Sequence, residues 1–377
     1  MNRRKCIGFL GGGQLARMSA YQAYKLGFNV AVLEKTPDSP AGQLTKYEFV
    51  GWVDDTNILI QFCSVSDVIT LENEFVDFEK LEFIEELGKK VVPSSHTISL
   101  IQDKLIQKKT LRKSGIPVAD FIDIDQYSNY ENISKILGSR FVLKSRKLGY
   151  DGYGNFEVKN SNNFLDGYKK LTERHKNLFA EKYVDFRMEL AVMVVRNKKE
   201  INTYPVVQTI QENHICKIVI APAPLSSRVI KLAKEISIET VKSVKGYGIF
   251  GVELFLTNDE IILVNEIAPR PHNSGHYTIE ACVCSQFENH VRAVFNLPLG
   301  STEMIKPNAI MVNLLGKKNR KLNLETYKKI LSIRDLHLHL YGKNESRVGR
   351  KMGHLTLLGD KPQILKLAKQ IEKKIII

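Results

Sequence analysis

The sequence predicts an α/β protein that continues into an α+β region, and three observations support this fold class. The first hundred or so residues alternate short apolar runs with amphipathic segments, a pattern typical of a parallel sheet flanked by helices. A glycine-rich turn at 147–155 follows an apolar run in the middle of the chain. Two apolar runs, 249–256 and 261–266, are separated by a short turn and predict a β-hairpin.

The composition predicts an ordinary globular enzyme of two or three domains, because 377 residues are too many for one simple core. There is no run of about eighteen apolar residues, so we expect no membrane span. The charged start leads directly into a strand and a turn, which argues against a secretory signal peptide. Five cysteines with irregular spacing favour reduced thiols and a cytoplasmic protein.

The formal net charge of +14 suits either nucleic acid or anionic small substrates. The basic residues are spread along the chain and carry no signature of a nucleic-acid-binding module. We expect many of them to form a solvated surface, and the rest to bind small phosphorylated substrates rather than nucleic acid.

The individual elements follow from hydrophobic periodicity and from glycine and proline positions. Strands are predicted at 5–10, 28–33, 67–71, 91–93, 141–144, 178–184, 188–195, 203–210, 309–314, 336–341 and 353–358, and helices at 14–26, 100–114, 226–245 and 362–374.

The first glycine turn, 11–16, fits the pattern G-x-G-x-x-A between a strand and a helix. Glu34 closes the next strand, near the place where an NAD enzyme keeps its ribose-binding acid. Physically, the turn indicates only that backbone N–H groups at a helix N-terminus can bind an anion. A monophosphate satisfies that description as well as a dinucleotide, so both alternatives stay open here.

The hairpin carries two acids, Glu253 and Glu266, that its turn brings close to cross-strand register. Two ionised carboxylates at that distance repel each other, and a divalent cation between them removes the conflict. Mg²⁺ bridging nucleotide phosphates suits such ligands, with Asn265 as a neutral oxygen donor. The alternative is two exposed acids, each paired with a nearby lysine.

Lys144 ends a strand just before the second glycine loop, so its ammonium has a fixed position from which to meet a phosphate. The backbone N–H groups of the loop can close over phosphates, although a plain surface turn is the alternative. Downstream, the strand edge at 181–184 can bind adenine and Glu189 can accept from ribose hydroxyls. A strand with exposed acids is the alternative for both.

The stretch 265–276 places an amide, a carboxylate, an arginine and two histidines directly after an apolar run. Burying such groups without partners costs about 1–3 kcal/mol for each neutral group and more for each charge. We therefore expect them to face a ligand.

These motifs resemble the ATP-grasp superfamily, and more closely the 5-(carboxyamino)imidazole ribonucleotide synthetases, a family of ATP-dependent carboxylases of purine biosynthesis. The similarity covers nearly the whole chain. It is carried by Gly11-Gly12-Gly13-Gln14-Leu15, Glu72-Asn73-Glu74, Gln102-Asp103-Lys104, Gly149-Tyr150-Asp151-Gly152, Asn265-Glu266-Ile267-Ala268-Pro269-Arg270, His272-Asn273-Ser274-Gly275-His276, Ser285-Gln286-Phe287-Glu288 and Gly349-Arg350-Lys351-Met352-Gly353-His354.

The resemblance implies an ATP-grasp fold with a Rossmann-like N-terminal domain at 1–100, an ATP-grasp domain at 101–300 and a small β-rich C-terminal domain at 301–377. A lid subdomain is expected at about 117–185. It implies a homodimer, and a reaction in which ATP phosphorylates bicarbonate to carboxyphosphate, which releases CO₂ to the amine of aminoimidazole ribonucleotide. Such a step needs cations for the transferring phosphoryl group and a site closed to water.

The resemblance also implies roles for individual residues. ATP is expected at Lys104, Lys144, Gly149, Gly152, Gly154, Asn155, Glu181, Lys182, Tyr183, Val184, Glu189, Gln211, Asn265 and Glu266, with Mg²⁺, or Mn²⁺ in its place, at Glu253 and Glu266. The catalytic residues are expected to be Tyr150, Asp151, Arg270, His272 and Asn273, and the ribonucleotide is expected at Gly12, Gln14, Glu72, Ser274, Lys343 and Arg350.

The chain departs from the family pattern at three positions. Tyr153 stands where an arginine is usual and removes a cation from the loop. Gln211 stands where a histidine often contacts the nucleotide, and Lys104 stands where some members have arginine, which replaces a bidentate contact with a point charge. We expect activity, with weaker affinity for ATP.

Two other functions stay open at this stage. One is an ATP-grasp enzyme with a different acceptor. The other is an NAD-binding oxidoreductase or a nucleotide-sensing module, against which the acidic pair of the hairpin argues.

Overall fold

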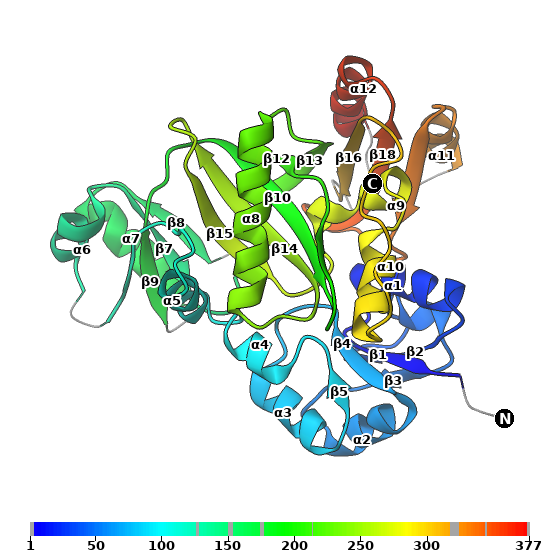
Figure 1. Ribbon diagram of the computed structural model, residues 1–377. Coiled ribbons are helices and arrows are strands. Elements are labelled where there is room, and N and C mark those ends of the chain that lie inside the picture. The colour runs from blue at the N-terminus through cyan, green and yellow to red at the C-terminus, as the bar shows by residue number, and fades with distance from the viewer. Residues whose placement is uncertain are drawn as a thin grey trace.

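Three β-sheets organise the part of the chain that the structure describes (Figure 1). The computed structural model describes residues 4–125, 128–149, 154–173, 177–212, 214–316, 324–343 and 345–374. Within these residues, no helix is long and apolar enough to cross a lipid bilayer.

The N-terminal sheet is entirely parallel and has the strand order β3-β2-β1-β4-β5, as the alternating pattern predicted. Every residue of its central strand β1 is buried, which a parallel strand covered by helices on both faces requires. The elements of this unit are β1 (Cys6–Leu10), α1 (Gln14–Lys25), β2 (Asn29–Glu34), the short η1 (Gly42–Leu44), β3 (Glu48–Val50), α2 (Thr56–Val65), β4 (Val68–Leu71), α3 (Phe78–Glu86), β5 (Lys90–Val91) and α4 (Ser95–Ser99).

A small antiparallel sheet follows, with the order β6-β9-β7-β8. Its helices α6 and α7 pack on it through a core that includes Ile133, Phe141 and Phe164. The elements here are α5 (Lys104–Lys113), β6 (Phe121–Asp123), α6 (Tyr130–Leu137), β7 (Phe141–Ser145), β8 (Asn155–Val158), α7 (Ser161–Thr172) and β9 (Leu178–Lys182).

The largest sheet runs in the order β15-β14-β10-β12-β13-β16-β18-β17, with β11 on the edge of β10. Its elements are β10 (Phe186–Arg196), β11 (Ile201–Thr203), β12 (Val207–Glu212), β13 (Ile215–Ala221), α8 (Ser227–Ser243), β14 (Gly248–Thr257), β15 (Ile262–Ala268), η2 (Asn273–Gly275), α9 (Thr278–Ala281), α10 (Gln286–Val294), β16 (Ala309–Leu315), α11 (Leu324–Leu331), β17 (Leu336–Leu340), β18 (Lys351–Leu358) and α12 (Lys361–Lys374).

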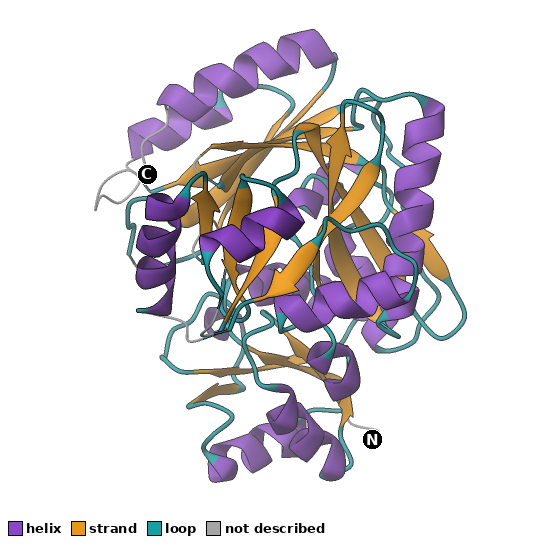
Figure 2. Ribbon diagram, turned by 90° about the vertical axis from the view of Figure 1, so that its left-hand side faces the viewer, coloured by secondary structure: helices purple, strands orange, loops and turns teal. Residues whose placement is uncertain are grey.

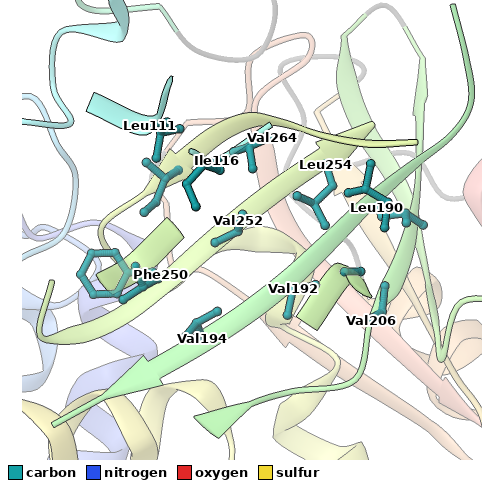
Figure 3. Close-up of a cluster of buried hydrophobic side chains, with 14 of the residues drawn as sticks. Leu111, Ile116, Leu190, Val192, Val194, Val206, Phe250, Val252, Leu254 and Val264 are labelled. Atoms are coloured by element: carbon teal, nitrogen blue, oxygen red, sulfur yellow. The ribbon is translucent and has the colours of Figure 1, made fainter. Parts of the chain in front are cut away.

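Helix α8 covers one face of this sheet, where Val192, Val252 and Leu254 belong to a continuous apolar core (Figure 3). The C-terminal strands β16, β17 and β18 extend the same sheet, and α12 packs against β16. In Figure 2 the large sheet lies between the N-terminal unit and the C-terminal helix. One sheet therefore spans the predicted boundary at residue 300, and the predicted domain bounds stay predictions.

Two predicted elements were wrong in their bounds for identifiable reasons. The helix predicted from residue 100 begins at Lys104, because the Asp103 side chain caps it by accepting from the N–H groups of Leu105 and Ile106. The strand predicted over 203–210 is divided into β11 and β12, because Pro205 lies between them and has no N–H for a ladder.

Candidate active site

Two lysines on one face of α5 contact carboxylates from different strands. Lys104 Nζ donates to Glu266 Oε2 at 2.7 Å. Lys108, one turn later, pairs with the Glu181 carboxylate, to which Lys144 of β7 also pairs. The side chains of Lys108 and Glu181 are each only 3% exposed, so neighbouring charges decide the ionisation of Glu181. Burial opposes its charge, but the two lysines outweigh burial and hold the pKa of Glu181 below its usual value.

Burial and neighbouring charges also decide the ionisation of the two lysines on α5. Burial lowers the pKa of Lys108 even though Glu181 opposes the shift. Burial also acts against the charge of Lys104, but the Glu266 carboxylate outweighs burial and raises the pKa of Lys104. The ammonium that approaches the hairpin is therefore held charged.

The acids of the hairpin lie side by side, as predicted: Glu253 on β14 is the register partner of Glu266 on β15. Glu253 Oε1 lies 3.2 Å from His272 Nε2, and Asn265 Nδ2 approaches Glu253 Oε2 at 3.5 Å. Burial acts against the charge of Glu253, but His272 and Lys104 lower its pKa to about 2. The repulsion between the two carboxylates is thus offset by a separate cationic or hydrogen-bonding partner for each.

These residues fit a Mg²⁺ ion that bridges phosphates. Mg²⁺ uses one or two protein carboxylates and completes its shell with waters and phosphate oxygens, so it needs no cage of protein ligands. Glu253 and Glu266 supply that pair, and Asn265 lies beside them. Within the described residues, no group of three or more His, Cys, Asp or Glu side chains is placed to hold a metal ion.

His272 is fixed from three directions. Its Nδ1 lies 2.8 Å from the Ser274 hydroxyl. The Gln286 amide accepts from the His272 N–H at 3.0 Å and donates to its carbonyl at 2.8 Å. The imidazole also packs against Gly251, where an added Cβ would lie 2.6 Å from His272 Cβ. Ser274, predicted to bind substrate, is itself buried and contacts His272 in the structure.

Arg270 is held by an acid from the N-terminal sheet. Its Nε and Nη2 form a bidentate contact with the Glu74 carboxylate, with Nη2 3.1 Å from Oε1. Burial acts against the guanidinium charge, but Glu74 outweighs burial and raises the pKa of Arg270. The loop after β15 is therefore tied to the end of β4.

Asn273 faces the C-terminal strands. Its side-chain amide pairs with that of Asn313 on β16, and the Asn313 amide also donates to the Cys216 carbonyl at 2.9 Å. Asn273 is half-buried and its amide is paired with Asn313, and its predicted catalytic role stays a prediction.

The first glycine turn is lined by two carboxylates. Gly12 N–H donates to Glu34 Oε2 at 2.8 Å, and Leu15 N–H donates to Glu72 Oε1 at 3.2 Å. Burial raises the pKa of Glu72. A ribonucleotide phosphate at Gly12 would therefore have to displace Glu34, while the neighbouring Gln14 begins α1. The predicted substrate contacts of this turn stay predictions.

Lys343 and Arg350 lie on the C-terminal side of the site. Lys343 Nζ donates to the Lys351 carbonyl at 2.7 Å, and the exposed Arg350 donates to the Glu345 carbonyl at 2.8 Å. The turn that carries Lys343 contacts the N-terminal unit, because Gln43 Nε2 donates to the Gly342 carbonyl at 3.1 Å.

The predicted adenine segment lies at the end of β9. The strand ends at Lys182, so Tyr183 and Val184 lie beyond its ladder, and Arg140 stacks 3.5 Å from the Tyr183 ring. The side chain of Glu181 is committed to its two lysines, which leaves the backbone for any contact with a base. Glu189 and Gln211 lie on β10 and β12, two adjacent strands of the large sheet.

The second glycine loop forms one wall of a cavity of about 210 Å³. Lys104, Glu266, Glu74, Lys147 and Gly149 line this cavity, so it joins α5, β15, the loop and the N-terminal unit. Gly154 and Asn155 continue from the loop into β8. The predictions for Tyr150, Asp151, Gly152 and Tyr153 lie outside the described residues.

Sequence reasoning missed four residues that build the site: Glu74, Lys108, Gln286 and Asn313. Lys108 had a detectable signal, since it lies four residues after Lys104 on a predicted helix. Glu74 and Gln286 lie in motifs that carry the family resemblance but had no role of their own. Asn313 lies in an apolar strand far along the chain, and nothing local predicts its contact with residue 273.

Sequence models of three domain families match the chain. The ribonucleotide synthetase preATP-grasp domain matches residues 4–102, the ATP-grasp domain matches 109–287, and the phosphoribosylaminoimidazole carboxylase C-terminal domain matches 309–367. The N5-carboxyaminoimidazole ribonucleotide synthase of Bacillus subtilis is 37% identical over 93% of this chain and 91% of its own length. The phosphoribosylaminoimidazole carboxylase of Ogataea methanolica is 42% identical, and the chain spans 66% of the length of that relative.

Solved structures agree with the sequence relatives. The carboxyaminoimidazole ribonucleotide synthase of Aspergillus clavatus, complexed with ATP, superposes with a TM-score of 0.91 at 38% identity and covers 98% of this chain and 97% of its own. The N5-carboxyaminoimidazole ribonucleotide synthetase of Thermotoga maritima gives a TM-score of 0.86 at 43% identity, with 98% of both chains covered. The chain has the ATP-grasp fold with preATP-grasp and C-terminal domains, and it belongs to the N5-carboxyaminoimidazole ribonucleotide synthase family.

Proposed function

We propose that the chain carboxylates aminoimidazole ribonucleotide with bicarbonate at the expense of ATP, as an ATP-dependent carbon–nitrogen ligase of purine biosynthesis. A bicarbonate oxygen attacks the γ-phosphorus and ADP leaves. The resulting carboxyphosphate breaks to CO₂ and phosphate. The exocyclic amine of the ribonucleotide attacks CO₂ and loses a proton, which gives the N-carboxylated product.

One observation carries this proposal: β15 and the loop after it bring Glu266, Arg270 and His272, which we assign to the two halves of the reaction, into one segment. Glu266 on the strand contacts Lys104, and six residues later His272 contacts Glu253. A solved relative from Aspergillus clavatus, with a TM-score of 0.90 at 37% identity, is described as a complex with ADP and 5-aminoimidazole ribonucleotide. That relative therefore binds the nucleotide and the ribonucleotide in one protein.

The site residues are assigned to different ligands according to their charge. We assign Lys104 and Lys144 to the ATP phosphates, and Glu253 and Glu266 would hold Mg²⁺, or Mn²⁺ in its place. The metal would neutralise charge on the transferring phosphoryl group. We assign Arg270 and His272 to bicarbonate, and Lys343 and Arg350 to the ribonucleotide phosphate. Because Glu74 and Ser274 fix Arg270 and His272, these groups need little reorganisation during the reaction.

We further propose a homodimer in the cytoplasm. The family resemblance supports the dimer. All five cysteines are free thiols in the structure, which suits a reducing compartment.

The proposal is tested by ADP release at fixed Mg²⁺ and bicarbonate, with and without aminoimidazole ribonucleotide. We expect ADP release to rise when the ribonucleotide is added and to fall when bicarbonate is removed. A panel of other amines and carboxylates provides the control for acceptor identity. ADP release that responds to a different acceptor and ignores this one would overturn the assignment.

A further inference from the structure

Asp103 and Arg146 form a clamp between the start of α5 and the end of β7. Arg146 Nε lies 2.9 Å from Asp103 Oδ2 and 3.2 Å from Oδ1, and Arg146 Nη2 lies 2.8 Å from Oδ2. In the opposite direction, the N–H of Lys104 donates to the Arg146 carbonyl at 2.7 Å. Asp103 is 6% exposed, so water competes little for these charge-assisted contacts.

The carboxylate of Asp103 does more than cap the helix. Its Oδ1 accepts from Leu105 N–H at 2.9 Å and from Ile106 N–H at 3.2 Å, which a neutral asparagine or serine also achieves at this position. Its second oxygen, Oδ2, is turned toward Arg146. The cap accounts for the contacts of Oδ1 with the helix. The contact of Oδ2 with Arg146 accounts for a charged carboxylate at this position.

Each residue of the clamp is a close neighbour in sequence of a cation assigned to ATP. Asp103 directly precedes Lys104, the first residue of α5, and Arg146 follows β7, two residues after Lys144. The helix is not part of the sheet that contains β7, so the backbone bond from Lys104 N–H to the Arg146 carbonyl and the side-chain clamp together fix their relative placement. Arg146 N–H also donates to the Asn177 carbonyl at 3.1 Å, which ties the same residue to the segment before β9.

We propose that Asp103 and Arg146 are a positioning pair that sets the spacing of Lys104 and Lys144 for the phosphates of ATP. This inference rests on the proposed function. Neither side chain needs to touch the nucleotide, because the effect passes through the adjacent lysines. A shift of about 1 Å in such groups can change a rate a hundredfold, so the precision of the clamp bears directly on turnover.

Two conservative variants separate positioning from folding. Asp103→Asn keeps the cap and removes the charge, and Arg146→Lys keeps the charge and removes the planar fork. We expect each to lower kcat/KM for ATP by about tenfold to a hundredfold, while KM for the ribonucleotide stays unchanged. Arg146 Nη1 also lies 3.6 Å from Asp123 Oδ1, so Arg146→Lys affects a second ion pair. The double variant should therefore be little worse than Arg146→Lys alone, because both substitutions break the Asp103–Arg146 contact. A purely structural role would reduce the active fraction and leave both KM values unchanged.

The matched control is Asp120→Asn, which breaks the exposed Arg112–Asp120 pair (3.4 Å) at the other end of α5. We expect its KM for ATP to equal that of the wild type. Calorimetric titration with Mg·ADP compares nucleotide affinity among the same variants without turnover. It therefore tests the positioning role even if the enzyme proves to use a different acceptor. Asp103→Asn and Arg146→Lys proteins that bind Mg·ADP and use ATP like the wild type would overturn the positioning role.

Discussion

The side-chain amides of Asn273 and Asn313 exchange two hydrogen bonds: Asn273 Nδ2 donates to Asn313 Oδ1 at 2.8 Å, and Asn313 Nδ2 donates to Asn273 Oδ1 at 2.6 Å. This pair joins the loop after β15 to the C-terminal strand β16. It fixes the backbone between His272 and Ser274, and so the orientation of the imidazole, from a part of the chain forty residues away.

Removing the Asn313 amide should loosen this loop. Asn313→Ala leaves the half-buried Asn273 amide without its partner and removes the donor to the Cys216 carbonyl, which together cost about 1–3 kcal/mol of unfolding free energy. Urea denaturation measures the loss. Asn308→Ala, which removes a single long hydrogen bond of 3.4 Å to the Gly359 carbonyl, is the control and should cost less. Equal stabilities for the two variants would contradict a special role for the amide pair.

Replacing Glu266 by Gln should abolish ATP turnover while the protein still folds. The variant removes one of the two carboxylates assigned to Mg²⁺ and also removes the charge that faces Lys104. We expect Mg·ADP binding to be lost in calorimetry. Glu260→Gln, on the exposed turn of the same hairpin, serves as the control and should bind normally. Normal ATP hydrolysis by the Glu266 variant would show that the metal assignment is wrong.

A methyl group at position 251 should displace His272. The Cβ of Gly251→Ala would lie 2.6 Å from His272 Cβ and 2.7 Å from Cγ, inside any normal contact. Overpacking of this kind costs about 1–3 kcal/mol. We expect acceptor-dependent kcat to fall while Mg·ADP affinity is kept. Gly246→Ala, which meets the Phe250 ring at 2.3 Å instead, should lose stability without this change in the kinetic pattern.

The pH dependence of stability should contain a contribution from Glu189. Burial and the Glu253 carboxylate raise its pKa to about 7, whereas the unfolded chain loses that proton near pH 4.3. Between these values the folded state binds the extra proton, so stability falls as pH rises through this window. Glu189→Gln should therefore exceed the wild type in urea midpoint at pH 8 and match it at pH 4. An identical difference at both pH values would exclude the shifted pKa.

Lys108 should be far more important for stability than its neighbour Lys109. Lys108→Met leaves the buried Glu181 with one cation fewer, and breaking a buried ion pair costs about 3–5 kcal/mol. Lys109 pairs with Asp123 at 3.9 Å on the surface, so Lys109→Met should cost at most about 1 kcal/mol. Parallel urea curves of the two variants measure the difference. Equal midpoints would show that Lys144 alone is enough to stabilise the buried charge of Glu181.

The sequence predicted the parts of the site that depend on local pattern. The alternation of the first hundred residues predicted the parallel sheet, and the turn at 258–259 placed Glu253 opposite Glu266. It did not predict contacts between residues distant in the chain, such as those of Glu74 with Arg270 and of Asn313 with Asn273. These contacts depend on how separate units pack, and a polar residue gives no local sign of a partner so far away.

The ion pairs around α5 have a consequence for how a nucleotide enters. Lys104 and Lys144 already have carboxylate partners, so Mg·ATP does not meet an open basic cleft. Phosphate oxygens would replace Glu266 at Lys104, and the released Glu266 carboxylate would be free to hold Mg²⁺. Binding is then an exchange of ionic partners, because Lys104 gives up a carboxylate oxygen and gains phosphate oxygens. Its free energy is a difference between two sets of contacts, and added salt screens the contacts that are lost as well as those that are gained.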